Sequence, residues 1–244
     1  AKARVSSCVR VAAVPGKPFL LRVRTMPRRL KRWILVAALA LVAVAAMAAA
    51  ELPYLPFVHG STAGEAERLA AWLELRPGTH VADLGAGDGT FSVALARRVG
   101  SSGLVYATEI DGGLLAEIRD AAAAAGLANV QVIPGAVSGT NLPEGCCDAL
   151  FSRMVYHHLT DAAAINADIF RVLRPGGRLL VIDFEPGGIM NWIGQPETAD
   201  RLGGHGTPRA TVLKEVTAAG FEVVRGPETW RGRTYGVLFR RPGP

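Results

Sequence analysis

The sequence predicts an α/β protein: a doubly wound, mostly parallel sheet with helices on both faces and an antiparallel hairpin at its C-terminal edge. Two observations support this fold class. From residue 63 onward, short apolar runs alternate with stretches whose apolar residues have helical spacing, which favours parallel strands joined by right-handed crossovers. Near the C-terminus, two strand-like runs follow each other with too few residues between them for a helix, so we expect those strands to pair antiparallel.

The alternation begins with a helix over residues 63–75, which Pro77 and Gly78 end. Each apolar run that follows is short enough for a buried strand, and a helical stretch comes after it. The expected strands are residues 80–84, 105–109, 130–133, 149–153 and 178–184. The expected helices between them are residues 91–99, 114–125 and 161–173, the last capped by Asp161.

The C-terminal part is expected to hold one more helix and the hairpin. Thr207 and Pro208 have the preferences of an N-cap and a first helical residue, and Gly220 ends the helix after Ala219. The last two strands are then expected at residues 221–225 and 234–240.

Charge is distributed unevenly along the chain. Residues 1–50 carry ten Lys or Arg and no Asp or Glu, so the remainder holds 17 of the 27 basic side chains against all 21 acidic ones. A basic groove for nucleic acid is therefore not expected. Three cysteines cannot form a disulfide framework, and no Cys/His spacing indicates a metal site.

The N-terminal part resembles a targeting segment. Residues 33–50 are uncharged and largely apolar, and four basic side chains precede them within residues 28–32. This pattern favours a signal peptide, with small residues at a cleavage site near residues 46–50, or a retained membrane anchor. Met26 is a candidate translation start, and Pro53 and Pro56 indicate a linker. The expected division is a non-native or disordered extension over 1–25, a signal peptide or anchor over 26–50, a linker over 51–62 and the α/β domain over 63–244.

A glycine-rich turn follows the first expected strand, in the order Asp83-Leu84-Gly85-Ala86-Gly87-Asp88-Gly89. Glycine is needed where the chain turns tightly and where a ligand approaches the backbone, and the helix behind it presents free N–H groups. Glu109 ends the second expected strand, where a carboxylate can accept both ribose hydroxyls of a nucleoside. Leu-Arg-Pro-Gly-Gly-Arg, residues 173–178, precedes the fifth strand.

Together these three motifs resemble the class I S-adenosylmethionine (SAM)-dependent methyltransferases over residues 63–241. The resemblance implies a Rossmann-like seven-stranded sheet whose last strand is antiparallel, SAM as cofactor, and methyl transfer as the reaction. It implies that the three glycines line the methionine moiety, with Asp83 near its amino group. Glu109 would hold the ribose and Ile110 would lie against the adenine. Many members have an acidic residue after the third strand, whereas this chain has Ala136 and Val137. The expected cofactor-binding residues are Asp83, Gly85, Ala86, Gly87, Gly89, Glu109, Ile110, Ala136, Val137 and Ser152.

Candidate acceptor residues follow the fourth and fifth strands, at the edge where open α/β sheets bind ligands. Methyl transfer needs a base only if the acceptor is protonated, and His157 or Tyr156 could bind or deprotonate it. His158 is a candidate too, although its position favours a structural role at the entry to a helix. Asp183 and Glu185 alternate and are expected on one face of the crevice. Residues 186–206, with Trp192 and His205, form either a lid or an uninvolved loop. The catalytic candidates are Tyr156 and His157, and the acceptor candidates are Tyr156, His157, His158, Asp183, Glu185 and His205.

The leading hypothesis is an enzyme that methylates a small molecule or a lipid-like acceptor. A SAM-binding but inactive interaction domain is the second, suggested by Ala136 and the targeting segment. An NAD-dependent oxidoreductase is disfavoured by the G-x-G-x-G spacing and by the hairpin. We expect no nucleic-acid partner, and membrane association or export through residues 33–50. The basic flank predicts that the domain lies outside, whereas the cytoplasmic face would suit SAM. The sequence does not indicate the acceptor or the oligomeric state.

Overall fold

The computed structural model describes residues 62–186 and 206–243. The predicted targeting segment at 26–50 lies outside these residues, as do the extension before it, the linker except for Thr62, and the loop residues Trp192 and His205. Among the described residues, none of the helices has the length and apolar character that a membrane span requires.

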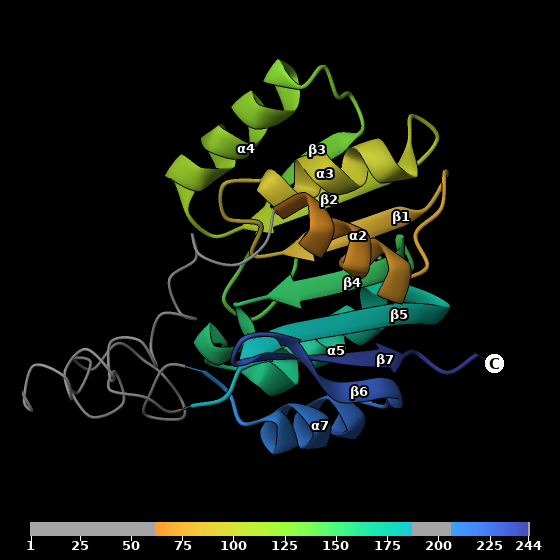
Figure 1. The fold of residues 1–244 in the computed structure, drawn as a ribbon, viewed down its shortest axis with the longest axis vertical. Coiled ribbons are helices and arrows are strands. Elements are labelled where there is room, and N and C mark those ends of the chain that lie inside the picture. Colours follow the sequence, from red (N-terminus) through yellow and green to blue (C-terminus); the bar gives the residue numbers. More distant parts are fainter. Residues whose placement is uncertain (1–61, 187–205, 244) are drawn as a thin grey trace, which may run out of the picture. The chain divides into compact units, whose positions relative to one another are not determined.

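A seven-stranded sheet forms the middle layer of the described part of the chain (Figure 1), in the order β3-β2-β1-β4-β5-β7-β6. Its strands are β1 His80–Leu84, β2 Leu104–Glu109, β3 Val130–Pro134, β4 Cys147–Arg153, β5 Leu173–Phe184, β6 Glu222–Arg231 and β7 Thr234–Arg240. β1 pairs parallel with both β2 and β4, and β4 pairs parallel with β5. β7 is antiparallel to both β5 and β6. The predicted mostly parallel sheet with an antiparallel C-terminal hairpin is confirmed.

Helices cover both faces of this sheet (Figure 1). They are α2 Thr62–Trp72, α3 Thr90–Val99, α4 Gly112–Ala124, α5 Ala162–Val172 and α7 Arg209–Ala218, with a short 3-10 helix η2 Tyr156–His158 after β4. One core contains buried side chains of α2 and α3 together with Val81 and Phe151 of the sheet. The other core contains those of α5 and α7 together with Leu84 and Leu150. The carboxyl ends of β1, β2 and β4 therefore lie at the edge of the sheet, between these two cores.

The predicted helix caps had different outcomes. Asp161 caps α5, since its side chain accepts a hydrogen bond from the backbone N–H of Ala164 at 2.9 Å. The predicted cap at Thr207 was wrong, because Pro208 occupies the N-cap position of α7. Thr207 is held to the sheet instead: its N–H donates to the Phe184 carbonyl at 3.0 Å, and its carbonyl accepts from the Tyr235 hydroxyl at 2.7 Å.

The sixth strand continues well past its predicted end at residue 225, to Arg231. Trp230, near its end, is buried and packs edge-on against Trp72 of α2, with ring centroids 5.1 Å apart. This contact connects the C-terminal hairpin to the helix that begins the domain.

Candidate functional site

The loop between β1 and α3 depends on three glycines in the left-handed region, with φ of 72°, 56° and 78° at Gly85, Gly87 and Gly89. A Cβ at Gly85 would lie 2.5 Å from a methyl carbon of Val155, and one at Gly89 would lie 3.1 Å from the Cα of Ile118. A Cβ at Gly87 would meet nothing within 4 Å. Gly85 and Gly89 are therefore required for packing, whereas Gly87 leaves open space beside the backbone.

Glu109 ends β2 and fixes this loop through its carboxylate. Oε2 accepts a hydrogen bond from the Gly87 N–H at 2.9 Å, while Oε1 accepts from the N–H groups of Ile110 at 2.7 Å and Asp111 at 3.3 Å. The side chain is held in one position before any ligand binds, and its remaining lone pairs can accept from ribose hydroxyls. The sequence predicted the ribose contact but not the contact with Gly87.

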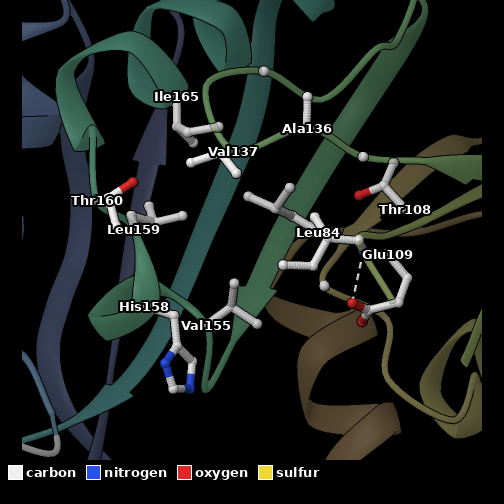
Figure 2. A pocket seen from close by; sticks show the side chains of 14 residues that line it. Leu84, Thr108, Glu109, Ala136, Val137, Val155, His158, Leu159, Thr160 and Ile165 are labelled. Atoms are coloured by element: carbon white, nitrogen blue, oxygen red, sulfur yellow. Dashed lines mark hydrogen bonds between the residues drawn. The ribbon is translucent and has the colours of Figure 1, made fainter. Parts of the chain in front are cut away.

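A cavity of about 340 Å³ lies beside Glu109. Figure 2 shows Leu84, Val155 and Val137 around it, with Glu109 at one side and Thr160 at the other. Most of its side chains are apolar, which suits the flat ring of a purine. The structure brings four predicted adenosine-binding residues together here: Glu109, Ile110, Ala136 and Val137.

A second cavity of about 300 Å³ adjoins the first and shares Gly85, Glu109 and Val155 with it. Its other lining residues are Asp83, Ala86, Gly87, Phe91, Phe151, Arg153 and Met154. The residues predicted to line the methionine moiety are therefore here, apart from Gly89. Ser152 lines neither cavity; its hydroxyl is buried and has no hydrogen-bond partner among the described residues.

Asp83 is the buried acid of the second cavity. Its Oδ2 accepts a hydrogen bond of 2.6 Å from the hydroxyl of Ser92, which is also buried. Burial raises the pKa of Asp83 to about 7, although the Ser92 hydrogen bond and the charge of Arg153 oppose this rise. A cation bound in the cavity would favour the ionised carboxylate, so this site fits the ammonium group of an amino acid.

Arg153 is a cavity residue that the sequence analysis missed. It ends β4, and its guanidinium lies over the ring of Phe91, 4.6 Å from the centroid. Nε and Nη2 donate to the two carboxylate oxygens of Glu65, at 2.7 and 3.2 Å. Its position at the carboxyl end of a buried strand was the signal available in the sequence, since ligands bind there in open α/β sheets.

The residues of η2 differ in their surroundings. Tyr156 is buried, and its hydroxyl donates to Glu215 at 3.0 Å and accepts from the Asn166 amide at 2.8 Å. His158, by contrast, is exposed and lines the first cavity at its edge (Figure 2). Tyr156 and His157 line neither of the two cavities. The position of Tyr156 therefore does not fit the predicted acceptor role.

His157 and Asp183 form a buried pair. The backbone N–H of His157 donates to one carboxylate oxygen of Asp183 at 2.9 Å, and its Nδ1 lies 2.9 Å from the other. Asp183 also accepts from the N–H of Phe184 at 2.8 Å and is fully buried. The expectation that Asp183 faces an open crevice is thus corrected: its carboxylate anchors η2 to β5. Glu185 forms an ion pair with Arg209 at the start of α7.

Residues 82–181 match the family model of the methyltransferase domain. This part of the chain is therefore a methyltransferase domain, as the resemblance to class I SAM-dependent methyltransferases implies. The fold class predicted from the sequence is confirmed, the match agrees with the predicted methyltransferase family, and SAM is the cofactor that such a domain implies. The two adjoining cavities, with a carboxylate placed for the ribose and a buried acid placed for an ammonium group, fit this cofactor.

Among curated relatives, the ubiquinone/menaquinone biosynthesis C-methyltransferase UbiE of Marinomonas sp. is 33% identical over 111 residues, which are 45% of this chain and 44% of the relative. UbiE of Vibrio vulnificus is 34% identical over 110 residues, which are 45% of this chain and 42% of that protein. The chain thus matches less than half the length of these relatives.

Solved structures share the fold. A SAM-dependent methyltransferase from Aquifex aeolicus has a TM-score of 0.62 at 23% identity and is covered over 89% of its length, with 72% of this chain. The [4+2]-cyclase SpnF has a TM-score of 0.60 at 18% identity, over 81% of its length and 75% of this chain. Proteins of this fold therefore include one named for a different reaction.

Proposed function

We propose that this protein transfers the methyl group of SAM to a small-molecule acceptor. The observation that carries the proposal is the pair of adjoining cavities, which meet at Gly85, Glu109 and Val155. One is apolar and suits an adenine ring, and the other contains the buried acid Asp83. Such a pair fits a molecule with a nucleoside at one end and an amino acid at the other.

The chain's own residues would mainly position the reactants. When bound, SAM would supply a methyl group whose carbon the acceptor atom attacks in line, while the carbon–sulfur bond breaks and S-adenosylhomocysteine leaves. The glycine loop and Glu109 would hold the nucleoside, Asp83 would attract the ammonium group, and Val155 lines both cavities. Because such a displacement gains most from orientation, a general base is needed only for an acceptor that must lose a proton.

The acceptor class is proposed from the relatives. UbiE proteins are named for ubiquinone and menaquinone biosynthesis, and two of them are 33% and 34% identical to this chain over 111 and 110 residues. We therefore place quinone precursors and other phenols first among the acceptors to be tested. Amines, thiols and lipids follow in the same screen.

Calorimetry on the full chain tests the cofactor half of this proposal. SAM and S-adenosylhomocysteine should bind and NAD should not. The absence of heat with both sulfur nucleosides would refute the proposed function. Methyl transfer from labelled SAM to the acceptor set then tests the reaction, with the Gly87→Arg variant as a control in which a side chain fills the open space beside the loop.

A SAM-binding domain without methyl transfer is the second candidate. It is favoured by the contacts of η2, because the Tyr156 hydroxyl bonds to Glu215 and Asn166 and the His157 imidazole bonds to Asp183. Binding of S-adenosylhomocysteine with no label transferred to any acceptor class would favour this candidate over the enzyme.

We also propose that residues 26–50 direct the protein to a membrane or to export. The basic flank and the uncharged stretch at residues 33–50 support this. Fractionation of tagged full-length and truncated chains tests it. A full-length product found only in the cytoplasm would refute the proposal.

A further inference from the structure

A small network of charges reaches the second cavity through Arg153. Its centre is Glu65 of α2, whose side chain is only 8% exposed. Besides the two hydrogen bonds from Arg153, its carboxylate accepts from the indole N–H of Trp230 at 3.0 Å and from Nη1 of Arg231 at 3.3 Å. One carboxylate therefore accepts hydrogen bonds from two guanidinium groups.

Glu65 is ionised within this network. Burial opposes ionisation of Glu65, but the hydrogen bonds and charges of Arg153 and Arg231 hold its pKa below the usual range. With Glu65 ionised, its carboxylate is a charged hydrogen-bond partner that holds the Arg153 guanidinium at the edge of the cavity.

Arg153 can present a guanidinium donor to a ligand in the cavity. Nε and Nη2 point to Glu65, whereas Nη1 has no hydrogen-bond partner within the described ranges, and the side chain is 34% exposed. The bidentate contact with Glu65 and the ring of Phe91 fix the plane of the guanidinium. The cavity is lined by both this cation and the carboxylate of Asp83, which comes from β1.

We infer that Arg153 binds the α-carboxylate of the methionine moiety of SAM, with Glu65 as its positioning residue. The moiety is a zwitterion, and a cavity with an acid and an arginine matches its ammonium and carboxylate groups. Arginine suits the second group because its planar donors fit a carboxylate. This inference rests on the proposed function, since it assigns a contact within the same cofactor site.

Decarboxylated SAM provides the test, because it keeps the adenosine, the sulfonium and the amine and lacks only the carboxylate. Calorimetry on the full chain should show that the wild type binds SAM about 10- to 100-fold more tightly than decarboxylated SAM, the scale of a charged hydrogen bond. Arg153→Met should lose most of that preference: its affinity for SAM falls by a similar factor, while its affinity for decarboxylated SAM stays within about twofold.

Arg231→Met is the matched control. Arg231 also bonds to Glu65 and has a similar exposure of 29%, but it lines neither of the two cavities. This variant should keep the wild-type preference for SAM. Arg153→Lys should keep part of it, because an ammonium group retains the charge without the planar donors.

Three results would overturn the inference. The wild type could bind SAM and decarboxylated SAM with equal affinity. This measurement uses the wild type alone and so does not depend on whether a variant folds. Arg153→Met could weaken both ligands by the same factor, which would indicate a role in shaping the loop. Arg231→Met could lose the preference as strongly as Arg153→Met. Failure of the wild type to bind either ligand would instead refute the proposed function.

Discussion

Replacing Asp83 by asparagine should make the protein more stable near pH 8 and weaken its binding of the cofactor. The carboxylate is buried against Ser92, and its ionised form is the one that burial disfavours. Asparagine has nearly the same shape, can accept the Ser92 hydrogen bond and carries no charge. The substitution therefore removes the desolvation cost together with the charge that would attract an ammonium group.

The size of the effect follows from the pKa of Asp83, which rises from 3.8 to about 7 on folding. A shift of about 3 units at about 1.36 kcal/mol each corresponds to about 4 kcal/mol. Because the folded protein holds this proton more tightly, the free energy of unfolding falls as pH rises from about 4 to about 7 and is level above. The Asp83→Asn variant has no carboxylate to ionise, so its free energy of unfolding should exceed that of the wild type by up to about 4 kcal/mol at about pH 8.

Urea unfolding across this pH range measures the difference between the Asp83→Asn variant and the wild type. The difference should grow steadily between about pH 4 and pH 7 and then level off. Ser92→Ala is the control, because it removes the hydrogen bond but keeps the carboxylate and hence the pH dependence. Parallel stability profiles of Asp83→Asn and wild type would refute the reasoning.

The affinity for the ligand should depend on pH in the opposite direction to stability. An ammonium group beside Asp83 requires the ionised carboxylate, so the affinity of the wild type for S-adenosylhomocysteine should fall by about tenfold per pH unit below about pH 7. The Asp83→Asn variant should bind more weakly near pH 8 and show no such slope. Calorimetry in a series of buffers measures both.

Further substitutions separate binding from folding. Glu109→Ala should weaken S-adenosylhomocysteine binding by roughly 1–3 kcal/mol in calorimetry, and unchanged affinity would contradict the ribose assignment. Gly87→Arg should abolish that binding and lower the thermal midpoint by several degrees, because a Cβ there meets open space but the left-handed backbone costs a non-glycine residue about 1–2 kcal/mol. His157→Ala should cost about 3 kcal/mol of stability in urea unfolding, since Asp183 loses a buried partner. Tyr156→Phe should cost about 1–3 kcal/mol without changing cofactor affinity. Unchanged stability of either variant with lost methyl transfer would support the catalytic role first predicted.

The fold was predictable because most strands and helices carry a local signal. The order of apolar runs, the glycine turn and the short connection between the last two strands predicted the sheet correctly. The end of the sixth strand was not predictable, because Trp230 is buried by Trp72, a residue far away in sequence. Thr207 has the side chain of a cap, but contacts with β5 and β7 determine its position.

The cofactor site was more predictable than the acceptor side. Glycines and a strand-end acid have few alternative roles at that spacing, and the structure brings Gly85, Gly87 and Glu109 together. Histidine and tyrosine occur in protein cores as well as in active sites, so these residue types alone do not indicate a role. The sequence also does not show that Asp183 contacts His157. Arg153 was missed because its partner Glu65 lies 88 residues earlier in the chain.

The place of β7 in the sheet has a consequence for biosynthesis. This strand lies between β5 and β6 although a ribosome makes it after both. Until residues 234–240 have emerged, the outer edge of β5 has no neighbour, and exposed apolar strand edges promote aggregation. The first strands can assemble during translation, whereas closure of the C-terminal half must wait for this segment. A chain truncated after Gly232 should therefore accumulate in the insoluble fraction, and a soluble, SAM-binding truncation would contradict this order of assembly.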